Sequence, residues 1–167
     1  MQEALLLQAK YNQFANNNMF HVLKKLDRQS LEQTYSCLYF GTILKTLKHN
    51  ISANIGIFLK EFSVYATNKP ANLNRLLEYK NLEIEKESIE SIESISAQID
   101  TAMIEIIENI NNFHQVETLS FPNVAFKKSR AQMLLAILNH SIHHRGQIAA
   151  ALDSIKIEND FAGMLSM

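Results

Sequence analysis

The sequence predicts an all-α domain, a four-helix bundle with a long crossover between the second and third helices. Only four glycines and two prolines occur among the 167 residues, and apolar residues recur at spacings of three and four. That spacing is typical of helices with one buried face. The 47% share of hydrophobic residues is enough to form a single core. Residues 1–167 contain no internal repeat and no Gly/Ser linker, so we expect one domain.

Two of the four predicted helices begin with a recognisable capping pattern. Ser30 with Gln33, and Ser129 with Gln132, match the capping box, in which a serine side chain and a glutamine side chain satisfy free backbone N–H groups. We therefore expect the second and fourth helices to start at these serines. The four helices are expected over about residues 3–26, 30–65, 87–112 and 129–155.

The segments between the helices have a different composition. Residues 66–86 contain Pro70 and a cluster of asparagines, which predicts the crossover, with one helical turn inside it. Residues 113–128 alternate around Pro122 and fit a small hairpin. The core-facing stripe expected for the second helix is Phe40, Leu44, Leu47, Ile51, Ile55, Phe58 and Phe62.

Composition excludes several classes of protein. The 16 basic residues nearly balance the 17 acidic ones and are scattered, so we expect no nucleic-acid partner, which would need a concentrated basic surface. The single cysteine, Cys37, cannot form an internal disulfide, which favours a reducing compartment. The first residues lack the pattern of a signal peptide, and no apolar run approaches the roughly 20 residues of a membrane span. We expect a cytoplasmic protein with no membrane partner.

Two histidines of the fourth helix point to a metal site. His140 and His144 are four residues apart, so they lie on one face of a helix, one turn apart. They fall in line with the apolar residues of that helix, and two imidazoles that face a core need partners there. A metal ion would accept both nitrogen lone pairs. Hydrogen bonding within the core is the alternative, since an isolated HxxxH spacing also arises by chance.

A third ligand should come from a facing helix, and His49 is the candidate. It lies nearly opposite the main apolar stripe of the second helix, along a line of small or polar residues, which suits a cavity-facing surface. His143 sits beside the pair and is at most a supporting residue. His21 and His114 have no partner pattern, so we expect structural or surface roles for both.

Three patches of the sequence together resemble the DinB-like family of metal-dependent four-helix-bundle proteins. Residues 11–16, YNQFAN, are similar to that family's Y-N-x-W-A-N signature. Residues 41–49 are similar to the segment that ends in its first metal histidine, and residues 139–147, NHSIHHRGQ, to its N-H-x-x-H-H-R-G-Q signature. The patches occur in the same order and with similar spacing as in the family, and together they extend over nearly the whole chain. Phe14 departs from the family pattern, since it stands where a tryptophan is usual.

The resemblance implies a site and a chemistry. It implies that His49, His140 and His144 hold a divalent metal ion, with the remaining coordination positions left to water or substrate. Zinc or nickel suits three imidazoles, as do iron and copper. Characterised relatives include transferases that use a low-molecular-weight thiol such as bacillithiol or mycothiol, and family members are commonly homodimers.

Two hypotheses about function therefore stay open. The first is a metal-dependent enzyme acting on a small-molecule substrate, either a thiol-dependent transferase or a hydrolase. The second is a non-catalytic protein that binds metal or takes part in a stress-related interaction. No acidic residue stands out on the core-facing part of the fourth helix as a general base, so the sequence predicts a site more clearly than it predicts a reaction.

Overall fold

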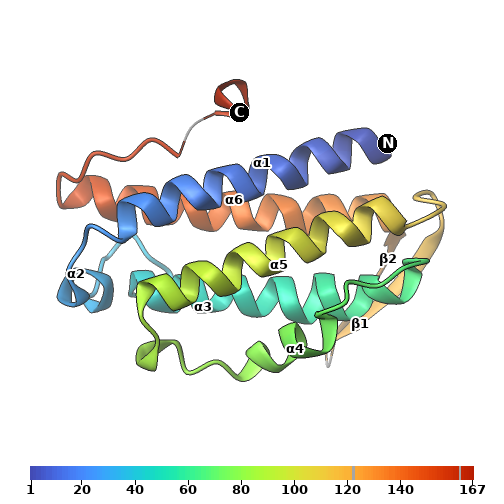
Figure 1. The fold of residues 1–167 in the computed structure, drawn as a ribbon, viewed down its shortest axis with the longest axis horizontal. Coiled ribbons are helices and arrows are strands. Elements are labelled where there is room, and N and C mark those ends of the chain that lie inside the picture. The colour runs from blue at the N-terminus through green and yellow to red at the C-terminus, as the bar shows by residue number, and fades with distance from the viewer. Residues whose placement is uncertain (122, 162) are drawn as a thin grey trace.

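The computed structural model describes residues 1–121, 123–161 and 163–167. Four long helical segments lie side by side (Figure 1). Helix α1 packs on α5 and α6, α3 packs on α6, and its continuation η1 packs on α5 and α6. The mostly helical class predicted from the sequence is confirmed, with one small two-stranded sheet in addition. The long segments are α1 (Gln2–Leu23), α3 (Ile43–Ala53) with the π-helix η1 (Asn54–Phe62), α5 (Ile89–Asn109) and α6 (Arg130–Ser154).

Short elements connect the long ones. The predicted crossover runs along the lower side of the view in Figure 1. It contains one short α-helix and two 3₁₀ turns, which is more helical structure than the single turn expected from its composition. The short elements are α2 (Arg28–Glu32), η2 (Ser63–Tyr65), α4 (Leu73–Glu78), η3 (Tyr79–Asn81), η4 (Ile84–Lys86), η5 (Met164–Ser166) and the strands β1 (Val116–Phe121) and β2 (Val124–Ser129).

The predicted start of the second helix is wrong. The Asp27 side chain caps α2 by accepting a hydrogen bond from the Ser30 backbone N–H at 2.8 Å, and Gln33 already has an extended backbone. Gly41 has φ of +83°, a conformation that side chains other than glycine rarely adopt. The long helix begins only after Thr42, whose hydroxyl accepts from the Lys45 N–H at 3.1 Å. A loop therefore divides the segment predicted as one helix.

The predicted start of the fourth helix is confirmed. Ser129 and Gln132 form a reciprocal capping box, so replacing Ser129 with alanine should lower the free energy of unfolding by about 1 kcal/mol, because a backbone N–H loses its partner. Ser30→Ala is the matched control, because Ser30 and Gln33 show the same sequence pattern but the side chain of Asp27 caps that helix instead. It should change stability by a few tenths of a kcal/mol at most. Urea denaturation of both variants measures the difference, and equal effects would contradict this assignment.

The predicted hairpin between α5 and α6 is confirmed as an antiparallel pair of strands. Leu119 pairs with Phe126 and Glu117 with Lys128. The turn expected at Pro122 lies outside the described residues. Arg130, the first residue of α6, donates to Glu117 at 2.7 Å and thereby ties the hairpin to the start of that helix.

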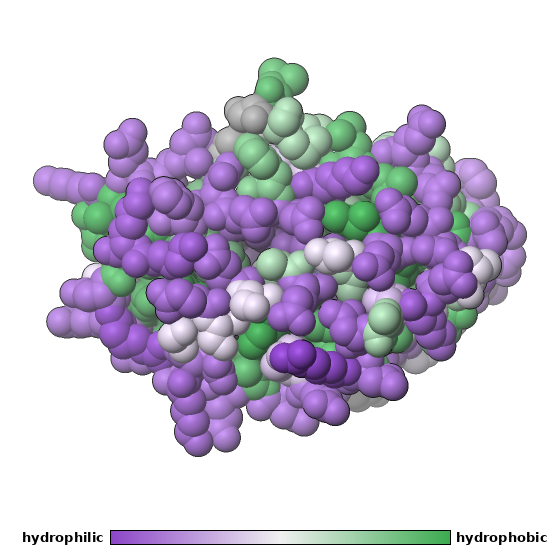
Figure 2. Space-filling model, viewed as in Figure 1, coloured by the Kyte–Doolittle hydropathy of each residue, from purple (hydrophilic) through white to green (hydrophobic). Residues whose placement is uncertain are grey.

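The core fills the space between the four long segments, and its largest fully buried side chains include Phe20, Phe58 and Phe62. The face shown in Figure 2, with α1 and α5 toward the viewer, is largely hydrophilic with apolar residues in scattered patches. None of the helices in the described parts of the chain combines the length and the apolar character needed to cross a bilayer. Cys37 is exposed and free.

Candidate metal centre

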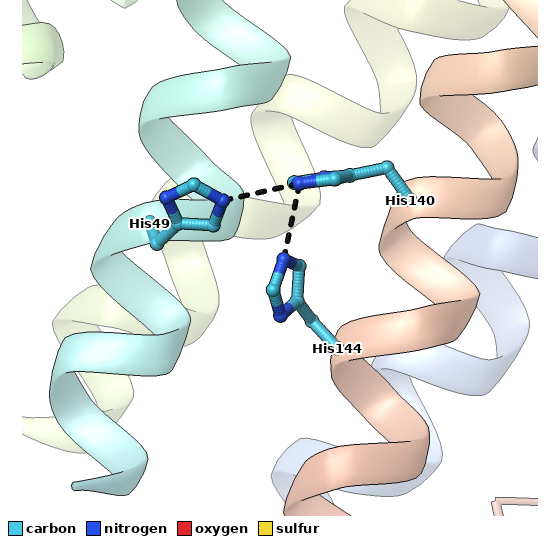
Figure 3. Close-up of side chains that lie close together, drawn as sticks. All are labelled: His49, His140 and His144. Atoms are coloured by element: carbon cyan, nitrogen blue, oxygen red, sulfur yellow. Dashed lines mark hydrogen bonds between the residues drawn. The ribbon is translucent and has the colours of Figure 1, made fainter. Parts of the chain in front are cut away.

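The fold brings the three predicted histidines together. His49 projects from α3, and His140 and His144 project from α6 one turn apart, with their ring tips converging (Figure 3). The Nε2 atom of His140 lies 3.1 Å from Nε2 of His49 and 3.0 Å from Nε2 of His144. The three rings form one group, and their potential ligand atoms all lie within 4.8 Å of one another. These residues could therefore hold a metal ion.

Hydrogen bonds around the rings leave lone pairs pointing at the shared centre. Oε1 of Gln147 lies 2.8 Å from Nδ1 of His144. Because that amide oxygen can only accept, Nδ1 carries the hydrogen and Nε2 of a neutral His144 presents a lone pair. Nδ1 of His140 is buried and has no hydrogen-bond partner among the described residues. Nε2 of His140 faces the Nε2 atoms of both His49 and His144 and can carry only one hydrogen, so it cannot form a full hydrogen bond to each of them. A cation at the shared centre would accept a lone pair from all three rings, which favours it over the hydrogen-bonded alternative.

The environment keeps the imidazoles neutral. Burial lowers the pKa of His140 to about 4, with further lowering by the neighbouring rings of His144, His49 and His143. Burial also lowers the pKa of His49 and of His144, although the hydrogen bond to Gln147 acts in the opposite direction for His144. Neutral imidazole is the form that donates a lone pair to a metal.

The spacing of the nitrogen atoms suits a metal of ordinary size. Bonds of about 2.0–2.1 Å in a tetrahedral arrangement place two ligand nitrogens about 3.3–3.4 Å apart. The separations from Nε2 of His140, 3.0 and 3.1 Å, differ from this value by a few tenths of an ångström, and the remaining separation in the group is within 4.8 Å. The group consists of three neutral ligands and includes no cysteine or acidic residue. Three such ligands leave at least one coordination position open.

Phe40 covers one side of the site. Its ring stacks on His49 with the ring centroids 4.1 Å apart, and it lies 5.9 Å from the ring of His144. The apolar spacing of the sequence predicted Phe40 in the core-facing stripe of a helix. It lies instead in the loop before α3, and that loop brings the ring over the histidines.

Buried hydrogen bonds join α3 and η1 to α6 next to the three histidines. The hydroxyl of Ser141 donates to Oδ1 of Asn50 at 3.1 Å, with Oδ1 of Asn54 at 3.4 Å. Asn50 follows His49 in sequence and Ser141 follows His140, so these bonds set the relative position of the two ligand-bearing helices. Sequence reasoning missed these hydrogen bonds, because nothing local pairs residues that are about ninety positions apart.

The two outer signature patches form one buried network. Arg145, which is 3% exposed, donates to Oδ1 of Asn16 at 2.9 Å and also to Oδ1 of Asn12. Asn16 in turn donates to Asp100 at 2.8 Å, and Asn12 donates to the backbone carbonyl of Leu138 at 2.9 Å. Burial raises the pKa of Asp100 to about 6, while the hydrogen bond from Asn16 and the charge of Arg145 lower it. The N-terminal asparagines therefore hold α6 in place and lie away from the histidine group.

The other histidines do not join this group. His143 is exposed, with its ring centroid 5.0 Å from that of His144. His21 and His114 are exposed as well, in agreement with the surface roles expected for them. Gln147 is the supporting residue that sequence reasoning passed over. Its position three residues after His144, on the same helix face, was the available signal.

Comparisons with known proteins identify the family of this chain. The family model described as "DinB family" matches residues 1–155. The chain is also similar to Protein DinB of Bacillus subtilis (strain 168), with 24% identity over 144 residues that cover 86% of this chain and 81% of the relative. The match spans all the helices that carry the histidines and the buried arginine network. This chain therefore belongs to the DinB family.

Proposed function

We propose that the protein is a divalent-metal-dependent enzyme whose metal ligands are His49, His140 and His144. The observation that carries the proposal is the convergence of three imidazoles, in which Nε2 of His140 lies 3.1 Å from Nε2 of His49 and 3.0 Å from Nε2 of His144. Zinc and nickel are the preferred ions, and iron or copper would also suit imidazole ligands. When bound, such an ion supplies Lewis-acid chemistry that lowers the pKa of a nucleophile and orients it.

Other residues of the chain orient the ligands and shield them from water. Gln147 holds His144 in the tautomer that turns Nε2 toward the centre, and Phe40 shields His49 from water on one side. The ligand group consists of three imidazoles, whose lone pairs would be taken up by the metal, and the proposed nucleophile is a molecule bound at an open coordination position. Water would make the protein a hydrolase, and a low-molecular-weight thiol would make it a transferase.

An activity screen tests this proposal. Protein prepared without a histidine tag would be loaded with each of the four metals and incubated with several thiols, generic electrophiles and ester substrates. We expect turnover that requires both the metal and His49, so that His49→Ala is inactive under the same conditions. The resemblance to thiol-dependent transferases of the DinB-like family supports the inclusion of thiols in the screen.

The second candidate is a non-catalytic protein that binds metal or acts in a stress-related interaction. The ligand group of three imidazoles would bind a metal without itself supplying a general base, which is what a protein that only binds metal requires. Stoichiometric metal binding together with consistent inactivity across the screen would select this candidate over the enzyme.

Metal binding should persist to a lower pH than ordinary histidines allow. With three ligands of pKa about 6.5, protonation would weaken binding about a thousandfold at pH 5.5. Burial lowers the pKa of all three, that of His140 to about 4, so fewer protons compete at that pH. We expect a decrease much smaller than a thousandfold between pH 7.5 and 5.5, measured by titration calorimetry. The full decrease would show that the rings titrate normally.

We also propose that the protein is a cytoplasmic homodimer that does not bind nucleic acid. Exposed apolar residues on α1 or α5 are the expected contact, for example Leu7, which is 46% exposed. Sedimentation should give twice the 19.1 kDa monomer mass. A mass near that of the monomer at every concentration would contradict the dimer.

A further inference from the structure

An apolar pocket of about 390 Å³ lies between the β-hairpin, α6 and η1. The hairpin contributes Leu119, Phe121 and Phe126, α6 contributes Met133 and Ile137, and η1 contributes Ile57. The volume falls in the range of about 300–1,000 Å³ that is typical of sites for small molecules. Two polar side chains, Lys128 and Gln132, also border the pocket.

The hairpin presents a consistent apolar face to this pocket. Leu119 and Phe121 are two residues apart on β1, and Phe126 pairs directly with Leu119, so all three side chains lie on one face of the sheet. The rings of Phe121 and Phe126 meet edge to face at 6.1 Å. Both rings nevertheless remain 38% and 46% exposed. Large apolar side chains that line a concavity without filling it are characteristic of a binding site.

The pocket lies close to the histidine group along the two helices that carry the histidines. On α6, Ala136 precedes His140 by one helical turn, which is about 6 Å along the axis, and Ala136 lines the pocket. On the facing helix, Ile57 follows His49 by two turns, with Ala53 between them. Phe40 contacts His49 and His144, and His144 lies beyond His140 as seen from the pocket. Phe40 thus covers part of the histidine group, and the residues one turn from His49 and His140 in the direction of the pocket, Ala53 and Ala136, are small.

We propose that this pocket binds the hydrocarbon part of an amphipathic small molecule whose polar, reacting group reaches His49, His140 and His144. This inference rests on the proposed metal site for the polar end only. The pocket selects the substrate by its alkyl or aryl group, because its wall is almost wholly apolar. Each additional methylene that enters should strengthen binding about fourfold until the pocket is full.

The pocket can be tested without metal. Straight-chain alcohols from butanol to octanol would be titrated into metal-free protein that is labelled at isoleucine and methionine methyl groups. We expect NMR shifts at Ile57, Met133 and Ile137, with affinity rising about fourfold per methylene. Ala136→Trp should block the pocket and abolish these shifts. Ala150→Trp is the matched control, since Ala150 is an exposed alanine on the same helix outside the pocket, and it should leave them unchanged.

The link to the metal is tested separately with alkyl hydroxamates of increasing length. They should bind zinc-loaded protein with the same dependence on chain length, and Ala136→Trp should remove that dependence while short hydroxamates still bind. If alcohols bind but no hydroxamate responds to zinc, the proposed metal site fails and the hydrocarbon pocket stands. If alcohols cause no shift at the three methyl groups, the pocket inference is overturned whatever the metal does. Conversion of a dimer to a monomer by Ala136→Trp would overturn it too, because a second copy of the chain would then occupy the pocket.

Discussion

Replacing His49, His140 or His144 with alanine is expected to weaken metal binding by more than 100-fold. Each change removes one of three converging nitrogen donors, which is a greater loss than the roughly 10–100-fold caused by removing a hydrogen-bond partner of a ligand. Titration calorimetry of protein without a histidine tag measures the effect. Circular dichroism should remain close to wild type, because the apolar core holds the helices together and water can enter the emptied site.

Two variants serve as controls for this ligand assignment. His143→Ala should keep most of the affinity, since His143 is exposed and lies outside the group of three. Gln147→Leu should reduce affinity by roughly 10–100-fold, because Nδ1 of His144 loses the acceptor that fixes its tautomer. The proposed site is wrong if His143→Ala abolishes binding while His49→Ala or His144→Ala leaves it intact.

Replacing Arg145 with methionine is expected to lower the free energy of unfolding by about 3–5 kcal/mol. Methionine fills similar space, but the oxygen atoms of Asn12 and Asn16 lose their donors. The buried Asp100, which reaches the arginine through Asn16, also loses the nearby positive charge. Removing one member of a buried charged network leaves the others without compensation. Urea denaturation of metal-free protein measures this loss without interference from ligand binding.

The matched control is Arg75→Met on α4, where the side chain is exposed. Its effect should stay within about 0.5 kcal/mol. Arg145→Lys should be nearly as damaging as Arg145→Met, because one ammonium group cannot reproduce the planar fork that reaches two asparagines. An Arg145→Met variant as stable as wild type would show that the network contributes nothing to the fold.

Features that depend on neighbouring residues could be predicted from the sequence. The Ser129–Gln132 capping box, the alternation of the hairpin and the face shared by His140 and His144 all arise within a few residues, where backbone geometry determines which groups meet. The same reasoning failed at Ser30, because Asp27 caps a short helix there and Gly41 lets the chain turn before α3. A local capping pattern cannot show which of two competing caps the whole fold will favour.

The sequence by itself determined the helical class, the shared inward face of His140 and His144 and the residue types available for a metal site. His49 was a candidate from its position, and the resemblance to the family supported it, but periodicity cannot say which helix faces which. Only the tertiary structure placed His49 against His140, Phe40 over His49, and Asn12 and Asn16 on Arg145. Those contacts join residues that are far apart in the chain, or lie in an irregular loop. These contacts depend on how whole helices pack together. The apolar periodicity of a helix specifies which of its faces is buried, but it does not specify which other helix packs on that face.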